Sequence, residues 1–421
     1  MLSISKPVLQ EPIGLLIEPH DTLLFRDGRP YGPTDTAHSQ FPLPQTLAGM
    51  MRTHLMHSLE LSSRQIHGLR ENANQMSLHQ RALAFIACRG PWLVKVKGDN
   101  EIEDLFVPAP AHLCRLDKDK EEKERSALLQ PLENGANLPG WQSPIPERQK
   151  HLRPVIYTKG PERVEPETRW LGKEAITSVL QAKVPNPDSL VEPEQLFAWE
   201  NRTGVTISPD TSAGEDSLLY SSSQLRFAKN VALYAEIGWE TVDEAHSDTS
   251  EEIRAAFERE IGWNRLFPET GVLLPFGGEA RRTSVRKIGT FAWPVVAQAP
   301  KTDATERAFT WLISPLVNHQ HTRTGGQREP WEPMSLGKLV GAVCPRYLPV
   351  SGWDLAGDER NNRRSRPRST RYAVPTGAVY FWERRGNAEQ NTDWLAGSLV
   401  QLAERPKDRA NGWGMALKGV W

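Results

Sequence analysis

Hydrophobic and polar residues follow two different spacings along the first hundred positions of this 421-residue chain. The apolar run from Ile13 to Phe25 predicts a strand. After Pro44, apolar residues recur at steps of three and four, which predicts a helix; they are Leu43, Leu47, Met50, Met51 and Leu55. Leu78 to Cys88 predicts a second helical piece, and Pro91 to Gly98 alternates apolar and basic residues like a strand. This β-α-β order favours a sheet with helices on one face.

The later elements are expected in a similar mixture. We expect a long hairpin at Val205 to Phe227 and a strand from Val231. A helix opened by a Thr249–Glu252 capping box should end at Ile261, and a strand with glycines and arginines should follow at Thr270 to Val285. The last expected elements are a strand at Ala373 to Arg384 and a helix from Trp394 to Glu404. Because both halves contain strands, helices and a glycine-arginine turn, a duplicated α+β architecture is expected.

Residues from about Arg115 to Pro154 break this pattern with alternating charges, proline and glycine. Such a mixture buries little apolar surface. We expect a solvated insertion without a chemical role.

Overall composition narrows the class of protein. The chain has 51 Lys+Arg against 52 Asp+Glu, so any nucleic-acid site must be local. The three cysteines, Cys88, Cys114 and Cys344, form no CxxC pair, which favours free thiols in a reducing compartment. Neither a signal peptide nor a transmembrane run is recognisable, so a soluble cytoplasmic protein without a membrane partner is expected.

The first candidate binding motif is Arg26-Asp27-Gly28-Arg29, where the opening strand is expected to stop. Two guanidinium groups and flexible amides at a sheet rim suit a phosphate. The helix start at Pro44 adds unpaired backbone N–H groups. The alternative is a tight turn with ordinary surface arginines.

The second motif is the hairpin bracketed by Arg202 and Arg226. A hairpin of this length is costly to order unless something packs on it. Either it folds onto its own domain, or it protrudes and grips a polymer or a partner subunit.

Two glycine-rich segments and one arginine run complete the binding candidates. Gly277-Gly278 precedes Arg281 and Arg282, and a later turn holds Gly412, Gly414, Lys418 and Gly419. Neighbouring glycines let a backbone approach a ligand, but neither segment matches a dinucleotide fingerprint or a P-loop. The run from Arg360 to Arg371 carries six arginines and no acid, as in a disordered loop or a loop beside an RNA groove.

Catalytic patterns are scarce. His54 and His57, and His319 and His321, are close pairs without a third ligand at a recognised spacing, so no metal is expected. Nucleophile elbows, HExxH and Walker signatures are absent from the sequence. We therefore expect neither an enzyme nor a cofactor.

Together the motifs resemble one family across nearly the whole chain. The segments HDTLLFRDGRPYG, FPLPQTLAGMMR, NRTGVTISPDTSAGEDSLLYSSSQLRF, FGGEARRTSV and VPTGAVYFWE occur in the order found in the RAMP-superfamily subunit of type III-B CRISPR-Cas effector complexes. That subunit caps the 5′ end of the guide RNA. The resemblance implies two ferredoxin-like (RRM-like) α+β domains, at 1–230 and 231–421, with a projecting thumb hairpin at about 200–227 and long loop insertions.

The resemblance also implies partners and site residues. The partners are the crRNA through its repeat-derived 5′ tag, the large polymerase-like subunit, the first backbone RAMP subunit and, indirectly, target RNA. The implied RNA-binding residues are Arg26, Arg29, Gln45, Arg52, Asn201, Arg202, Thr203, Arg226, Gly277, Gly278, Arg281, Arg282, Gly412, Gly414 and Lys418. The hairpin tip departs from the family by reading Gly214-Glu215-Asp216, and the 115–154 and 360–371 segments look peculiar to this chain.

Two other functions stay open at the level of sequence. One is a guide-processing endoribonuclease of the same superfamily, for which His20 or His38 would be the general base or acid. The other is a scaffold that binds only protein.

Overall fold

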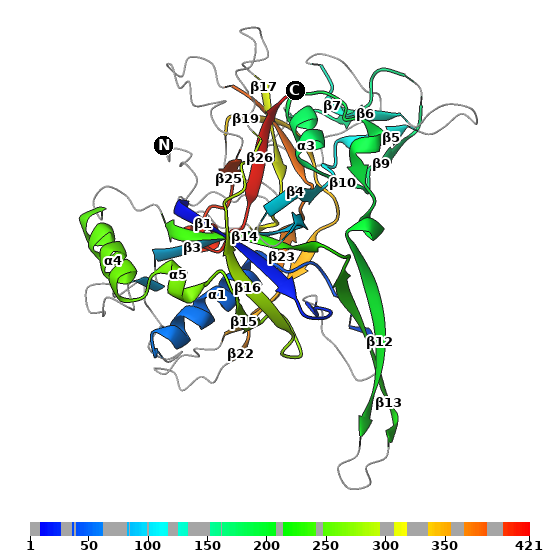
Figure 1. The fold of residues 1–421 in the computed structure, drawn as a ribbon. Helices are drawn as coiled ribbons and strands as arrows, with labels where there is room; N and C mark the ends of the chain where they lie inside the picture. Colours follow the sequence, from blue (N-terminus) through cyan, green and yellow to red (C-terminus); the bar gives the residue numbers. More distant parts are fainter. Residues whose placement is uncertain are drawn as a thin grey trace.

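The computed structural model places two sheets in one body and sends a long hairpin away from it (Figure 1). It describes residues 9–26, 36–37, 39–61, 82–83, 85–98, 101–116, 125–133, 152–160, 162–207, 214–240, 247–294, 307–317, 336–354, 366–384 and 399–421. Within these residues, no helix has the length and apolar character required to cross a membrane.

The larger sheet has eight strands, each antiparallel to its neighbours. In spatial order they are β11 (Leu190–Val191), β10 (Trp170–Leu171), β4 (Glu101–Pro108), β3 (Ile86–Lys97), β14 (Val231–Glu240), β1 (Leu9–Pro19), β16 (Arg282–Ile288) and β15 (Val272–Pro275). The predicted strand from Val231 is confirmed, and its almost continuous apolar run fits a central position with both faces covered.

Helices cover one face of the large sheet. The predicted helix is confirmed as α1 (Pro44–Ser58), with Pro44 in the first turn and its apolar positions buried. α1 packs with α4 (Ser247–Glu260) and α5 (Trp263–Leu266) against Leu15 and Ile17 of β1. α4 already includes Ser247, so Thr249 is not the cap that the sequence predicted.

The opposite face of the large sheet packs on a second sheet. That sheet has the order β19 (Lys338–Val343), β24 (Val379–Glu383), β17 (Arg307–Leu312), β26 (Met415–Val420) and β25 (Leu399–Gln401). Leu16 and Trp92 of the large sheet share a core with Trp311 and α3 (Lys173–Leu180). The Trp92 indole N–H donates to the carbonyl of Ile313 at 3.0 Å, which ties the two sheets together.

Several small elements surround this body. They are the sheet β18 (Leu316–Val317), β23 (Arg371–Val374), β20 (Leu348–Val350); the pair β21 (Trp353–Asp354), β22 (Arg366–Pro367); the sheet β6 (Ser126–Leu128), β5 (Leu113–Leu116), β9 (Val164–Pro166); the pair β7 (Gln130–Pro131), β8 (Val155–Ile156); and the short helices η3 (Pro187–Ser189), η4 (Pro193–Gln195) and α6 (Pro406–Ala410). The 115–154 segment is therefore not solvated throughout, because Ala127 and Leu129 within it are buried.

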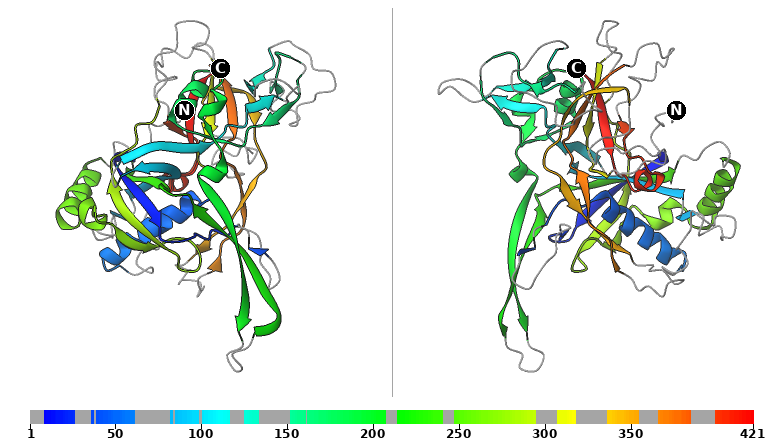
Figure 2. Two further views of the ribbon diagram at one scale, coloured as in Figure 1. Left: turned by 45° about the vertical axis from the view of Figure 1, so that its right-hand side comes forward. Right: turned by 180° about the vertical axis from the view of Figure 1, so that it is seen from behind.

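The predicted hairpin is confirmed and is longer than expected. β12 (Phe197–Ile207) pairs antiparallel with β13 (Gly214–Phe227), and β2 (Thr36–Ala37) runs parallel beside β13. The three views in Figures 1 and 2 show the hairpin extending beyond the rest of the molecule. The protrusion is thus confirmed, and the grip on a polymer or a partner subunit stays a prediction.

Four further predicted elements differ from the structure. The first strand ends at Pro19 rather than Phe25, and β3 already starts at Ile86 within the predicted second helix. The strand predicted at Ala373 to Arg384 is two strands, β23 and β24, separated by a turn at Pro375 and Gly377. Residues 399–401 of the predicted last helix form β25. A short apolar run fits the spacing of a helix as well as that of a strand, so the strands available for pairing decide which of the two forms.

The architecture is mixed α/β and dominated by sheets. The predicted domain boundary at 230/231 falls between β13 and β14. The eight-stranded sheet contains strands from both sides of that position. The division into two domains stays a prediction.

Candidate nucleic-acid interface

Three predicted arginines converge on one carboxylate that follows β1. Asp21 Oδ2 lies 3.1 Å from Arg202 Nη2 and 3.3 Å from Arg281 Nη1, and Asp21 Oδ1 lies 2.9 Å from Arg226 Nη2. The arginines belong to β12, to β13 and to the turn between β15 and β16. Folding therefore brings the hairpin motif, the glycine-arginine motif and the segment after β1 together at the root of the hairpin.

Two further acids complete this group, which we call the Asp21 cluster. Glu200 accepts hydrogen bonds from Arg202 Nε at 2.7 Å and from Arg226 Nε at 2.5 Å. Glu279 accepts one from Arg281 Nη2 at 3.0 Å. The cluster thus contains three arginines and three carboxylates and is formally neutral.

The protonation behaviour of the acids reflects these contacts. Desolvation raises the pKa of Asp21, but hydrogen bonds from Arg202 and Arg226 outweigh it and hold that pKa below its ordinary value. Hydrogen bonds from Arg226 and Arg202 lower the pKa of Glu200. Both acids are therefore ionised at neutral pH, and they compete with any phosphate that approaches the arginines.

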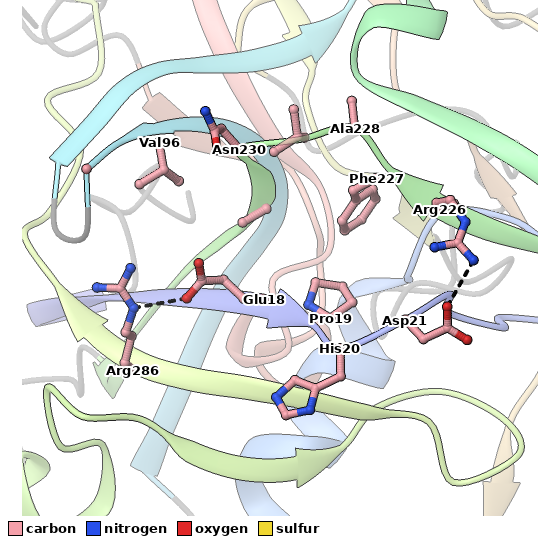
Figure 3. A pocket seen from close by; sticks show the side chains of 13 residues that line it. Glu18, Pro19, His20, Asp21, Val96, Arg226, Phe227, Ala228, Asn230 and Arg286 are labelled. Carbon is pink, nitrogen blue, oxygen red and sulfur yellow. Dashed lines mark hydrogen bonds and ion pairs between the residues drawn. The ribbon is translucent and has the colours of Figure 1, made fainter.

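The cluster is open to solvent and adjoins a cleft. The side chains of Arg202, Arg226 and Asp21 are 34%, 45% and 44% exposed. The cleft has a volume of about 370 Å³ and is lined by both Asp21 and Arg226. Figure 3 shows the Arg226–Asp21 ion pair at one end and the Glu18–Arg286 pair, at 3.0 Å, at the other. A strand of nucleic acid can reach the guanidinium groups from this side.

The two faces of the hairpin carry different chemistry. Because side chains alternate along a strand, Arg202 and Glu200 share one face. Ala198 pairs with Arg226 across the ladder, which puts Arg226 on that same face. Asn201 and Thr203, also predicted to bind RNA, lie on the opposite face together with Trp199. Folding therefore separates these predicted residues from the arginines.

An apolar cavity of about 310 Å³ lies at the root of the hairpin. It is lined by Trp199, Trp170 and Phe41. The ring centroid of Phe41 lies 5.3 Å from that of Trp170 and 6.0 Å from that of Trp199. Pro44, at the start of α1, also lines the cavity. Flat aromatic walls of this kind accommodate a flat aromatic ring.

The two glycines at 277 and 278 serve close packing. Gly277 has a φ of +91°, and a Cβ there would lie 2.6 Å from the carbonyl oxygen of Leu24. The Gly278 N–H donates to the same oxygen at 2.7 Å. These contacts fix the turn that carries Arg281 against the segment that follows Asp21.

The N-terminal candidates are only partly described. Arg26 is exposed and forms an isolated bridge with Ser39, whereas Arg29 lies outside the described residues. Arg282 is exposed at the start of β16, and its carbonyl accepts the His20 N–H at 3.1 Å. His20 itself lines the cleft beside Asp21.

Two predicted residues on α1 contact the C-terminal half. The Gln45 side-chain amide donates to the carbonyl of Ser351, and Arg52 donates to the Asn411 side chain. These contacts dock the helix and place neither residue in the Asp21 cluster.

The glycine-rich C-terminal turn is buried. Gly412 has a φ of +87°, and a Cβ there would lie 2.8 Å from the Cys88 carbonyl oxygen. A Cβ on Gly414, with a φ of +71°, would lie 2.7 Å from the backbone nitrogen of Ala403. Lys418 is 6% exposed in β26. These three residues fit a packing role better than the RNA-binding role that the resemblance implied, because RNA cannot reach buried groups.

The remaining candidates are histidines, cysteines and the arginine run. His54 hydrogen-bonds the Leu266 carbonyl, and the described part of the chain holds no group of three His, Cys, Asp or Glu suited to a metal. Burial raises the pKa of Cys88 and Cys114 to about 11. His38, His319, His321 and the arginines before Arg366 lie outside the described residues.

Sequence reasoning missed the three residues that organise the interface. Asp21 and Glu200 were not singled out, although each lies a few residues before a predicted arginine. Trp199 directly precedes the predicted hairpin residues. In the sequence, these residues could have been found only as acids or aromatic residues close to a binding motif.

Comparison with known proteins gives the class as a CRISPR-associated protein. The model of the family described as CRISPR-associated protein (Cas_Cmr3) matches residues 15–421. The chain belongs to this Cas_Cmr3 family, which confirms the resemblance to the Cmr-type, type III-B subunit seen in the sequence. A search of curated proteins finds no match.

Several solved structures are similar to this chain at low identity. A chain of a type III-B Cmr-β complex bound to cognate target RNA and AMPPnP is 15% identical with a TM-score of 0.42, covering 87% of this chain and 86% of that one. A second Cmr-β structure, bound to cognate target RNA, is also 15% identical with a TM-score of 0.42, covering 93% and 98%. A Csm3–Csm4 subcomplex of type III-A is 10% identical with a TM-score of 0.35, covering 88% and 94%.

Proposed function

We propose that this Cas_Cmr3 protein is a non-catalytic subunit that holds the 5′ repeat-derived tag of the guide RNA at the root of its hairpin. The observation that carries the proposal is the convergence of Arg202, Arg226 and Arg281 on Asp21 in an exposed cluster beside a cleft. Guanidinium groups bind phosphate through paired hydrogen bonds, so three of them close together can hold the backbone of the tag.

Phosphate binding at the cluster proceeds by exchange. A tag phosphate takes the place of the Asp21 or Glu200 carboxylate on Arg226, so that the guanidinium group keeps an anionic partner throughout. The released carboxylate turns to water, which is accessible there because Asp21 is exposed. The resulting contacts hold the backbone of the tag and carry no information about its bases.

A base of the tag has a separate place to bind. We propose that the hairpin wedges into the strand and displaces one base into the apolar cavity of Trp199, Trp170 and Phe41. Stacking of a base on an aromatic side chain contributes about 1–3 kcal/mol. The hairpin then marks where the tag ends and the target-pairing region begins.

We also propose that the protein bridges the large polymerase-like subunit and the first backbone subunit, and meets target RNA only through the guide. The projecting hairpin supports this, since its outer part extends beyond the body and is available to a neighbour (Figure 2). An element that folds onto its own body could not serve as such a bridge.

The strand order supports a duplicated ferredoxin-like fold with a boundary later than residue 230. Across the large sheet, four neighbouring strands follow in the order β3, β14, β1, β16. Numbered along the chain, they are the second, third, first and fourth strands of the unit. As expected for this fold, α1 connects β1 to β3 and α4 connects β14 to β16. β17, β19, β24 and β26 repeat the same order. We infer one unit at 9–288 and another at 307–420.

The proposal is tested by the guide content of the effector complex. The R202A/R226A variant should reduce the tagged guide that co-purifies with the assembled complex, while circular dichroism stays unchanged. R259A is the matched control, because Arg259 is an exposed arginine on α4 with only a surface ion pair. Unchanged guide content in R202A/R226A contradicts the proposal.

Absence of catalysis is part of the proposal and has its own test. His20 is the described histidine nearest the cluster, since it lines the same cleft as Asp21 and Arg226. We expect the protein alone to leave repeat RNA intact in a metal-free buffer. Specific cleavage that is lost in H20A would instead assign an endoribonuclease.

A further inference from the structure

Two large aromatic side chains stand exposed on the small sheet β18-β23-β20. Tyr347 is 69% exposed and Tyr372 is 58% exposed, the largest fractions among the exposed large apolar side chains of the described residues. Their ring centroids lie 4.8 Å apart with an angle of 77° between the ring planes. The two rings thus form an open aromatic corner on the surface.

The fold does not require tyrosine at these positions. Ala373 and Val350 of the same sheet are buried in a core cluster, and side chains alternate along a strand, so Tyr372 faces solvent. Tyr347 directly precedes β20. An exposed pair of large rings contributes little to the core and is typical of a binding surface.

Arginines lie close to both tyrosines in the chain. Arg346 and Arg368 are exposed, and Arg371 is half-buried beside Asp408, with their nearest polar atoms 3.9 Å apart. The 360–371 segment that leads into β23 contains no acidic residue. Unlike the arginines of the Asp21 cluster, Arg346 and Arg368 have no carboxylate partner among the described residues.

We propose that Tyr347, Tyr372, Arg346 and Arg368, the Tyr347–Tyr372 patch, bind single-stranded RNA. A base stacks on one tyrosine ring and meets the edge of the other, and the two arginines contact the flanking phosphates. Stacking rings beside cationic side chains are the usual composition of a sequence-tolerant single-strand site. The charge favours RNA over a protein surface, because unpaired arginines attract polyanions.

The patch goes beyond the tag site. It lies on a sheet of the C-terminal half, whereas the Asp21 cluster lies at the hairpin root. The patch does extend toward α1, since Gln45 and the Arg368 side chain both approach Gly352. It would therefore hold a further stretch of RNA that need not contain the tag.

The test measures binding of the full-length protein to a labelled oligouridine of about ten nucleotides, long enough for one such site and lacking any tag. Fluorescence anisotropy of Y347A/Y372A should show a Kd raised about fivefold or more, the lower end of the effect of removing one stacked base. Y347F/Y372F keeps the rings and should bind like the original protein. V184A, which truncates an exposed apolar side chain outside the patch, should have no effect.

Salt dependence tests the arginines separately. R346A/R368A should reduce the slope of log Kd against log salt by about 0.7 for each phosphate of a single strand that these arginines neutralise in the original protein. The R202A/R226A variant should retain oligouridine binding at the patch, so that failure of either proposal is distinguishable from failure of the other.

Two outcomes overturn the patch proposal. One is an unchanged oligouridine Kd in Y347A/Y372A, or in the single variants if the double variant fails to fold. The other is loss of a neighbouring protein subunit from the complex without any change in RNA binding, which would assign the patch to a protein partner.

Discussion

Arg281 Nη1 lies 3.3 Å from Asp21 Oδ2, although 260 positions separate the two residues in the chain. This contact joins the glycine turn between β15 and β16 to the end of the first strand. The same carboxylate holds Arg202 and Arg226 of the hairpin. Asp21 is therefore the residue through which three segments of the candidate interface are connected.

Removal of the Asp21 charge should strengthen RNA binding. In D21N the three arginines lose a competing anion, so we expect the Kd for tagged RNA to fall about two- to tenfold, which corresponds to about 0.4–1.4 kcal/mol. The measurement is a salt titration of binding to the full-length protein. Weaker binding by folded D21N would show that the carboxylate serves RNA binding rather than competing with it.

Gly277 should be intolerant of a side chain. At its φ of +91° a Cβ would lie 2.6 Å from the Leu24 carbonyl oxygen, so G277A should lose about 1–3 kcal/mol of stability. Because the turn carries Arg281, binding of tagged RNA should weaken as well. Denaturant unfolding and RNA titration measure the two effects.

Gly289 provides the control for this substitution, because a Cβ there meets no atom within 4 Å. G289A should remain close to the original protein in both measurements. Equal effects of G277A and G289A would rule out the proposed close approach.

The buried ion pair of Arg89 and Glu236 should be costly to break. Arg89 Nη1 lies 3.2 Å from Glu236 Oε2, and Glu236 Oε1 also accepts the Tyr234 hydroxyl at 3.0 Å. E236L leaves a buried guanidinium group without its partner, which should cost about 3–5 kcal/mol in urea unfolding. The R89M/E236L double variant should recover part of this loss. If the stability lost in R89M/E236L equals the sum of the losses in R89M and E236L measured separately, the two residues are not coupled.

A buried histidine should make stability depend on pH. Burial lowers the pKa of His112 from 6.5 to about 3. Between these values the unfolded chain binds a proton that the folded chain excludes, so stability falls as the pH drops below 6.5. The expected loss from this group is about 1.4 kcal/mol per pH unit.

H112L removes this titration and provides the comparison. Urea unfolding at pH 7 and at mildly acidic pH should show a smaller loss for H112L than for the original protein. The same pH dependence in both would mean that His112 accepts a proton while folded.

The sequence predicted those features that depend on local spacing. The steps of three and four after Pro44 define α1, and the alternating residues before Phe227 define β13. Local preference also sufficed for β14, where a continuous apolar run occupies the centre of a sheet. The family resemblance came from the order of such motifs.

Features that depend on distant partners were not predictable. Nothing near Asp21 in the sequence indicates that Arg281 will contact it. Nor does the sequence around Gly412 indicate that Cys88 of β3 packs against it. The last predicted helix fails for the same reason, since pairing of Leu399 with Leu417 makes that segment a strand. Tertiary pairing overrides local propensity at these positions.

The most direct test of the central claim is a photocross-link from a reactive nucleotide placed within the 5′ tag of the guide in the assembled complex. Mass spectrometry then identifies the protein segments attached to the tag. Our account predicts attachment at the Asp21 cluster, which comprises Asp21 and the segments 197–207, 214–227 and 277–282, or at Phe41 and Trp170 of the apolar cavity. Attachment confined to other segments of the chain, or to other subunits alone, would contradict it.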